Sequence, residues 1–225
     1  MRIPYEKTAL LAVDIQNDFC PAYGGANGEA RPEGALAVRG AAAVIAPLNA
    51  LAARVRAGGG KALATQDWHP AGHISFASSH RGKRPGDAIL LPDGTEQVLW
   101  PDHCAAGSAG AALHDGLDQT LIDRVFRKGS RVDIDSYSAF FENDRRTPTD
   151  LGPYLAAEGI DTLIIGGLAT DYCVFYTVQD ALRLGFTVYV AEDACAGIDL
   201  PPGSLDRAVK AMKEGGAVFI PAGRG

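Results

Sequence analysis

A cysteine at the start of a predicted helix is the residue in this sequence best placed to act as a nucleophile. Cys173 follows a short apolar run at 163–165, which is typical of a buried parallel strand, and two glycines that end the run, Gly166 and Gly167. After Cys173, apolar side chains recur at helical spacing until Gly185, which is a typical stop signal. Cys173 is therefore predicted in the first turn of a helix that starts at the carboxyl end of a strand.

The start of that helix favours negative charge. Thr170 or Asp171 is predicted as its N-cap. Unpaired backbone N–H groups and the helix dipole favour a thiolate on Cys173, and they also favour an oxyanion on a bound substrate. Because a buried cysteine is more often an inert part of the core, the residues around Cys173 decide between the two interpretations.

Three more reactive side chains come at the ends of predicted strands. They are Asp14 after the strand at 8–13, Asp67 after the strand at 61–65, and Lys128 after the strand at 120–126. Since the carboxyl ends of parallel strands meet at one edge of a sheet, all three should lie near Cys173. Asp14 could then exchange a proton with the thiol, and Lys128 could stabilise both charges. Taken singly, Asp14 is better explained by a cap or turn after the strand, and Lys128 by solvent exposure, and only the combination with Cys173 favours a triad.

A carboxylate and two imidazoles have the pattern of a catalytic metal site. Asp67 and His69 are two residues apart, so on an extended segment both side chains point to one side. His103 is a candidate for the third ligand. A metal ion held by only three protein ligands keeps open coordination positions, which is typical of a catalytic site and not of a structural one. The alternative is that these histidines only make hydrogen bonds in loops. The other three, His73, His80 and His114, are interpreted as hydrogen-bonding or surface residues.

Aromatic residues lie close in the sequence to these polar groups. They are Phe19, Trp68, Trp100 and Tyr137. Such side chains wall pockets for flat rings, although packing in the core explains each of them equally well. A flat aromatic substrate is therefore one hypothesis for the site.

The elements that must position these residues alternate between strands and helices. Helices are predicted near 48–55, 150–158, 170–184 and 205–212, and further strands at 163–165, 186–190 and 217–220. This order predicts an α/β fold, a three-layer αβα sandwich with a mostly parallel, doubly wound central sheet. With 225 residues, the chain is expected to form one domain over 1–225.

Two stretches lack a regular periodicity. The loop at 21–34 is rich in glycine and proline and is unusually long, so we interpret it as a functional lid or a mobile insertion. The stretch 69–116 is interpreted as loops and short elements built over the site.

Composition and charge exclude several classes of function. The net charge of −6 and the lack of a basic run argue against a nucleic-acid partner. The apolar runs are too short to span a membrane, and the first run ends in an acid, as in a strand and unlike a signal peptide. The four cysteines show no CxxC spacing, so reduced thiols and a cytoplasmic location are expected.

Six motifs spread over nearly the whole chain occur in the order found in one family. They read DIQNDF at 14–19, DWHPAGHISFAS at 67–78, WPDHC at 100–104, RKG at 127–129, DSYSAF at 135–140 and GLATDYCV at 167–174. Together they resemble the nicotinamidase (pyrazinamidase) branch of the isochorismatase-like cysteine hydrolases. The resemblance implies hydrolysis of nicotinamide, and of pyrazinamide as a second substrate, through a thioester. For nicotinamide the products are nicotinic acid and ammonia, in a reaction of NAD salvage.

The resemblance also implies a role for each matching residue. The implied triad is Cys173 as nucleophile, Asp14 as general base and acid, and Lys128 as third member. The implied ligands of one divalent metal ion per chain, zinc or iron, are Asp67, His69 and His103. The implied ring pocket consists of Phe19, Trp100 and Tyr137.

Three finer features follow from the same resemblance. The peptide bond between Leu168 and Ala169 is expected to be cis, and the N–H groups of Ala169 and Cys173 are expected to form the oxyanion hole. Ser78 lies where some members of the family place an additional group of the metal shell. The expected partner is a small-molecule substrate, and the sequence does not fix the oligomeric state, so a homo-oligomer stays open.

Other activities remain alternatives to this hypothesis. A metal-free relative with the same fold would act on isochorismate, an N-carbamoyl compound or a ureido acid, but the DxH and WPxHC patterns favour the metal-dependent amidase. Non-haem iron oxygenases also bind metal through two histidines and one carboxylate. A third alternative is a metal-binding scaffold protein without enzymatic activity. Such a protein has no need of a triad whose members lie at three strand ends, which argues against this alternative.

Overall fold

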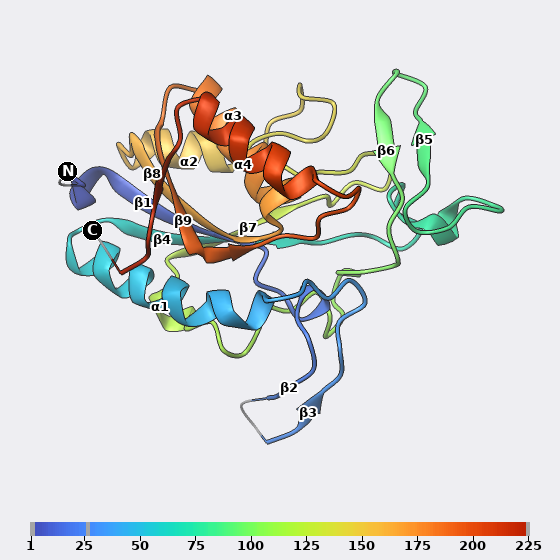
Figure 1. Ribbon diagram of the computed structural model, residues 1–225, viewed down its shortest axis with the longest axis horizontal. Helices are drawn as coiled ribbons and strands as arrows, with labels where there is room; N and C mark the ends of the chain where they lie inside the picture. The colour runs from blue at the N-terminus through green and yellow to red at the C-terminus, as the bar shows by residue number, and fades with distance from the viewer. Residues whose placement is uncertain (1–2, 26–27, 224–225) are drawn as a thin grey trace.

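A parallel sheet of six strands runs through the molecule (Figure 1). The computed structural model describes residues 3–25 and 28–223. Within them the strand order is β10-β9-β8-β1-β4-β7, and all five pairings are parallel. The strands are β1 (Thr8–Val13), β4 (Lys61–Asp67), β7 (Arg124–Lys128), β8 (Thr162–Leu168), β9 (Thr187–Ala196) and β10 (Val218–Ile220). The two central strands, β1 and β8, are buried along their whole length because helices cover both faces.

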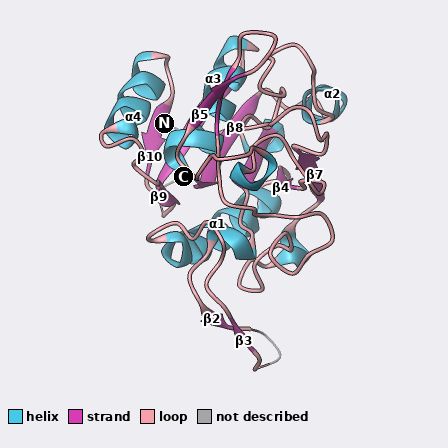
Figure 2. Ribbon diagram, turned by 90° about the vertical axis from the view of Figure 1, so that its right-hand side faces the viewer, coloured by secondary structure: helices cyan, strands magenta, loops and turns pink. Residues whose placement is uncertain are grey.

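Four helices form the outer layers. They are α1 (Ala41–Ala57), α2 (Leu151–Ala157), α3 (Phe175–Arg183) and α4 (Ser204–Glu214). Figures 1 and 2 show α1 on one face of the sheet and α2, α3 and α4 on the other. Each face has its own apolar core, with Leu48 and Leu51 of α1 in one and Val178 and Met212 in the other. This arrangement confirms the predicted three-layer αβα sandwich. Among the described residues, no helix is long and apolar enough to cross a membrane.

The two stretches without periodicity each contain a small hairpin. In the loop at 21–34, β2 (Tyr23–Gly24) pairs with β3 (Ala30–Arg31), and the hairpin projects on the α1 side of the sheet (Figure 1). In the stretch 69–116, β5 (Ala88–Leu90) pairs with β6 (Glu96–Val98). A turn of 3₁₀ helix at Ala77–Ser79 and loops make up the rest of the stretch 69–116, in line with the loops and short elements expected there.

One predicted strand begins at the wrong place. The apolar pattern predicted a strand from Thr120, but Gln119–Leu121 is a turn of 3₁₀ helix and β7 begins only at Arg124. The carboxylate of Asp118 explains the difference, because it accepts hydrogen bonds from the backbone N–H and the hydroxyl of Thr120. The strand end is unaffected, and Lys128 is the last residue of β7.

Candidate active site

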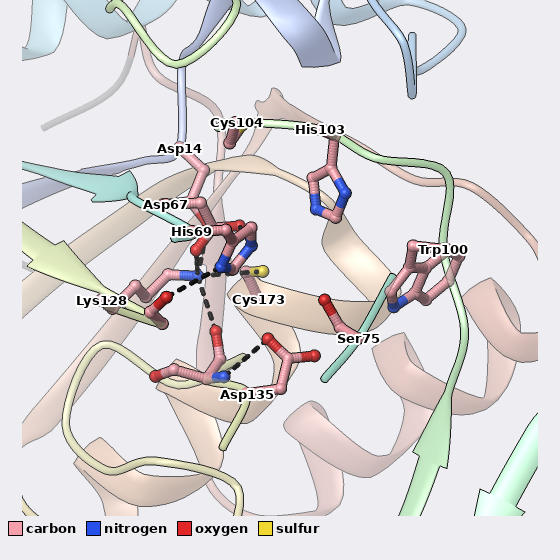
Figure 3. A network of polar contacts seen from close by, with 12 residues as sticks. Asp14, Asp67, His69, Ser75, Trp100, His103, Cys104, Lys128, Asp135 and Cys173 are labelled. Atoms are coloured by element: carbon pink, nitrogen blue, oxygen red, sulfur yellow. Dashed lines mark hydrogen bonds and ion pairs between the residues drawn. The ribbon is translucent and has the colours of Figure 1, made fainter. Parts of the chain in front are cut away.

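The four strand-end residues singled out in the sequence meet at the carboxyl edge of the sheet (Figure 3). The ammonium group of Lys128 is at the centre. Its Nζ lies 2.9 Å from Oδ2 of Asp14, 2.5 Å from Oδ1 of Asp67 and 3.4 Å from Sγ of Cys173. It also donates to the carbonyl oxygen of Ser136 at 2.9 Å. A buried lysine is stable when its donors and its charge are satisfied, and here two carboxylates and a carbonyl do so.

Asp14 is a fully buried carboxyl group held in a fixed orientation. It directly follows β1 and has a positive φ of 50°. Its Oδ1 accepts a hydrogen bond of 2.6 Å from the hydroxyl of Thr65, whose oxygen accepts from the Asp14 N–H at 3.1 Å. Burial raises the pKa of Asp14 above its ordinary value, although Lys128 opposes the rise. A carboxyl with a raised pKa exchanges protons more readily near neutral pH.

Cys173 lies in a turn of π-helix, Thr170–Val174, between β8 and α3. Burial raises the pKa of its thiol well above the ordinary value, with Lys128 opposing the rise. Desolvation thus opposes the thiolate that the helix start favours, so the thiol of Cys173 needs a base to ionise it, as the sequence indicated. The ligand atoms of Asp14, Asp67 and Cys173 lie within 4.8 Å of one another, so the base is within reach of the thiol proton.

Neither predicted N-cap caps the helix. The carboxylate of Asp171 instead accepts hydrogen bonds from the N–H groups of Ile198 and Asp199 and from the hydroxyl of Ser204. The side chain of Thr170 makes no capping bond either. Asp171 thus ties the turn that carries Cys173 to the loop after β9.

Asp67, His69 and His103 form a second buried cluster next to the first. Their ligand atoms lie within 4.8 Å of one another, and Nε2 of His69 is 3.7 Å from Oδ2 of Asp67. Nδ1 of His69 faces the carbonyl oxygen of Gly129 at 2.9 Å, and Nδ1 of His103 faces that of Pro101 at 2.8 Å. Such bonds fix the tautomer and leave Nε2 of each ring free to bind a metal.

The state of these groups suits a divalent cation. Burial lowers the pKa of His69 to about 4, and burial together with His69 lowers the pKa of His103. Both rings are therefore neutral at pH 7, as metal ligands must be. Two imidazoles and one carboxylate match the ligand set of a catalytic zinc site with open positions. The residues present therefore fit the metal that the sequence predicted.

A cavity opens beside both clusters. The predicted Phe19, Trp100 and Tyr137 line it, together with Cys173, Ala169 and the residues of the second cluster. The indole N–H of Trp100 donates to the hydroxyl of Tyr137 at 3.0 Å, which holds the two rings in place. Trp68 does not line the cavity, and its ring instead stacks under the guanidinium of Arg127 at 3.7 Å. The Leu168–Ala169 peptide bond is cis, as expected.

The fold and the site can be compared with known proteins. A model of the isochorismatase domain matches residues 8–222. The chain belongs to the isochorismatase domain family. The nicotinamidase of Acinetobacter baylyi is 47% identical to it over 212 residues, which cover 94% of this chain and 91% of the relative.

Two solved structures are also similar to this chain. The nicotinamidase/pyrazinamidase of Acinetobacter baumanii has a TM-score of 0.87 and 44% identity, with 97% of both chains covered. The pyrazinamidase of Pyrococcus horikoshii in complex with zinc has a TM-score of 0.74 and 32% identity, covering 96% of this chain and 99% of that one.

Several residues of this isochorismatase-family site were missed in the sequence. Leu36, Tyr172 and Ile198 complete the cavity wall. Gln16 orients Asp67, because its Oε1 accepts from the Asp67 N–H at 2.8 Å and its Nε2 donates to the Asp67 carbonyl at 2.9 Å. Gln16 stands two residues after the end of the first strand, among other polar residues at 14–18, so only its position at the strand end could have identified this role.

His73 and Asp135 lie next to the metal-type cluster. The ring of His73 stacks on that of His69 with centroids 4.1 Å apart, and its nitrogens face Ser75 and Ile134. Asp135 accepts hydrogen bonds from Nε2 of Gln97 and from the N–H of Ser136. The sequence left His73 as a hydrogen-bonding or surface residue, and it is a fully buried residue that makes hydrogen bonds.

Two further expectations concerned the edges of the site, namely Ser78 as an additional group of the metal shell and the loop 21–34 as a lid. The hydroxyl of Ser78 donates to Asp102 at 2.5 Å. The described residues of the loop 21–34 do not line the cavity, and Leu36, just beyond it, does. The hairpin in this loop is held by Tyr23, which stacks on His114 with centroids 3.7 Å apart.

Proposed function

We propose that this protein hydrolyses nicotinamide to nicotinic acid and ammonia. The observation that carries the proposal is the contact of Asp14, Lys128 and Cys173 on the wall of a cavity that also holds a three-ligand metal cluster. A thiol, a buried acid and a lysine form the machinery of an acyl transfer. The family members at 47% and 44% identity, named nicotinamidases, support this substrate. The whole chain, 1–225, is proposed to act as one catalytic domain.

The reaction starts with a proton transfer within the triad. Asp14 takes the proton of the Cys173 thiol, and the thiolate attacks the carboxamide carbon of the substrate. The backbone N–H groups of Ala169 and Cys173 are proposed to stabilise the tetrahedral oxyanion. Asp14 returns the proton to the nitrogen, the C–N bond breaks, ammonia leaves, and a thioester remains on Cys173.

Hydrolysis of the thioester uses the same acid. Asp14 removes a proton from a water molecule, which attacks the thioester carbonyl carbon. The C–S bond breaks, nicotinic acid leaves, and the proton on Asp14 returns to the sulfur. Lys128 keeps its charge throughout, because burial opposes the charge but Asp14 and Asp67 outweigh it and raise the pKa of the lysine.

Asp67, His69 and His103 are proposed to hold one divalent metal ion. Zinc is favoured by the ligand set and by the zinc complex of the Pyrococcus horikoshii relative, and iron is the alternative. When bound, the metal supplies a cation that attracts the pyridine nitrogen and so orients the ring. The rings of Phe19 and Trp100 then enclose the flat substrate, which excludes water from the thiol.

The test is product analysis with purified protein. Incubation with nicotinamide should release equal amounts of ammonia and nicotinic acid, and prolonged treatment with a chelator should suppress both. An N-carbamoyl compound and a ureido acid serve as competing substrates. Hydrolysis of either of these, with nicotinamide left intact by reduced and zinc-loaded protein, would contradict the proposal and favour a metal-free relative.

A further inference from the structure

The substrate cavity has a mouth made of partly exposed side chains. Most residues that line the cavity are buried, but four are only partly buried: Leu36, Tyr137, Tyr172 and Ile198. These four mark the side of the cavity that is nearest to solvent. Of the described residues, Ile198 is the one that also lines a large neighbouring groove. Its side chain therefore stands between the cavity and the groove.

The groove beyond Ile198 has room for an extended chain. Its volume is about 1000 Å³, and it runs between the start of α1, the end of β9 and one side of α4. Apolar side chains follow its length: Val44, Leu205, Val209 and Phe219. Apolar surface of this kind attracts alkyl groups, because contact with them removes both surfaces from water. A substrate with an alkyl chain would thus find a favourable path if the wall at Ile198 were open.

The loop that carries Ile198 is fixed by the two residues that precede the nucleophile. The carboxylate of Asp171 is buried and accepts hydrogen bonds from the N–H groups of Ile198 and Asp199, each at 2.9 Å. The hydroxyl of Tyr172 donates to the carbonyl oxygen of Leu200. Hydrogen bonds to an ionised acceptor are roughly twice as strong as neutral ones. The wall is therefore held at a set distance from the thiol and does not open freely.

The proposed orientation of the substrate directs one ring carbon at the mouth. In that orientation the pyridine nitrogen lies at the metal cluster and the carboxamide lies at Cys173. Ring carbon C5 of nicotinamide is meta to both groups, so it points away from both. The buried part of the cavity wall belongs to the metal cluster, the nucleophile and the ring pocket. A substituent on C5 therefore meets the mouth and not the reacting groups.

We propose that Ile198 is a specificity-determining residue, which excludes amides with a long alkyl chain on C5 of the ring. Asp171 is the positioning residue that holds this wall in place. The inference rests on the proposed function, since it concerns the same substrate cavity. Shape selection by an apolar wall changes kcat/KM about 10- to 200-fold for a change as small as one methylene. A fixed wall at Ile198 is therefore sufficient to restrict the enzyme to small rings.

The probe is 5-hexylnicotinamide, compared with nicotinamide by ammonia release from zinc-loaded protein. The wild type should hydrolyse the probe with a kcat/KM at least about 100-fold below that for nicotinamide. Ile198→Ala should raise kcat/KM for the probe about tenfold or more, and lower it severalfold for nicotinamide through lost contacts. The matched control is Leu36→Ala, which removes as many carbon atoms from a mouth residue that does not line the groove. It should change the ratio of the two kcat/KM values by less than about twofold.

Asp171→Asn tests the positioning role. The amide has nearly the size of the carboxylate but accepts fewer hydrogen bonds, so the loop at Ile198 should loosen. We expect KM for nicotinamide to rise more than kcat falls, and the discrimination against 5-hexylnicotinamide to decrease. A purely structural role would lower the free energy of unfolding and the activity on both substrates equally, with the ratio unchanged.

Three results would overturn the inference while the proposed function stands. The first is a wild type that hydrolyses both amides equally well, which means that no wall faces C5. The second is a wild type active on nicotinamide whose Ile198→Ala variant gains nothing on the probe. The third is an equal gain in Leu36→Ala, which would place the selecting wall elsewhere in the mouth. A wild type without activity on nicotinamide would instead contradict the proposed function, and this inference with it.

Discussion

Replacing Gly129 by alanine should weaken the metal site without changing a metal ligand. Gly129 follows β7 and has a φ of +57°. Its carbonyl oxygen faces Nδ1 of His69 at 2.9 Å. A Cβ atom on Gly129 would lie 2.5 Å from Cε1 and 2.7 Å from Nδ1 of the same ring. The imidazole must therefore move by about 0.9 Å to reach an ordinary contact of 3.4 Å.

The two consequences of this change have different magnitudes and different readouts. An alanine in the left-handed region lowers the free energy of unfolding by about 1–2 kcal/mol. The ring displacement exceeds the roughly 0.5 Å within which a functional group must be held. Disturbing the bond that orients a metal-binding histidine typically lowers metal affinity about 10- to 100-fold. We expect a zinc affinity reduced by this factor, with a parallel loss of ammonia release at limiting zinc.

The matched control is Gly159→Ala. Gly159 has a similar φ of +67°, but a Cβ atom there meets nothing within 4 Å. Both variants should therefore lose free energy of unfolding in urea, measured without metal, through the same backbone strain, and Gly129→Ala should lose more because its Cβ also displaces the buried His69 ring. Only Gly129→Ala should lose zinc affinity, measured by competition with a chromophoric chelator. If Gly129→Ala binds zinc within about twofold of the Gly159→Ala control, the placement of His69 as a ligand is wrong.

The contacts of Cys173, Lys128 and Glu142 lead to three more expected results. Cys173→Ala should keep its metal but release ammonia on the order of 10⁴-fold more slowly, and activity within tenfold of wild type would remove the nucleophile. Lys128→Met leaves two buried carboxylates facing each other and should lower the free energy of unfolding by about 3–5 kcal/mol in urea, while a loss below about 1 kcal/mol would argue against the ion pairs. Burial raises the pKa of Glu142 to about 7, so its contribution to stability is present below the unfolded pKa near 4.5 and is lost as pH rises through 7. Relative to Glu142→Gln, the wild type should lose about 1–3 kcal/mol between pH 4.5 and 8, and a pH-independent difference would contradict this.

Local patterns predicted the strands and the residues at their ends. The apolar run at 8–13 coincides with β1, and Asp14 follows it directly. Asp67 and Lys128 are the last residues of β4 and β7. Because parallel strands present their carboxyl ends at one edge, knowing where each strand ends was enough to bring these side chains together.

Long-range contacts were beyond the reach of local patterns. Gln16 binds the backbone of Asp67 across 51 residues of sequence, and Asp171 binds the loop after β9 and not its own helix. The protonation state of Cys173 also depends on burial by distant segments, which helix position alone does not show. In each case a tertiary contact outweighs or replaces the local interaction that the sequence favours.

The central claim is that nicotinamide is hydrolysed through an acyl group on Cys173. The most direct test is to mix zinc-loaded protein with nicotinamide, quench in acid within one turnover, and measure the mass of the peptide that contains Cys173. A nicotinoyl thioester on this peptide, which disappears as nicotinic acid forms and is absent from Cys173→Ala, is the predicted result. Formation of nicotinic acid at the wild-type rate by Cys173→Ala would contradict the account.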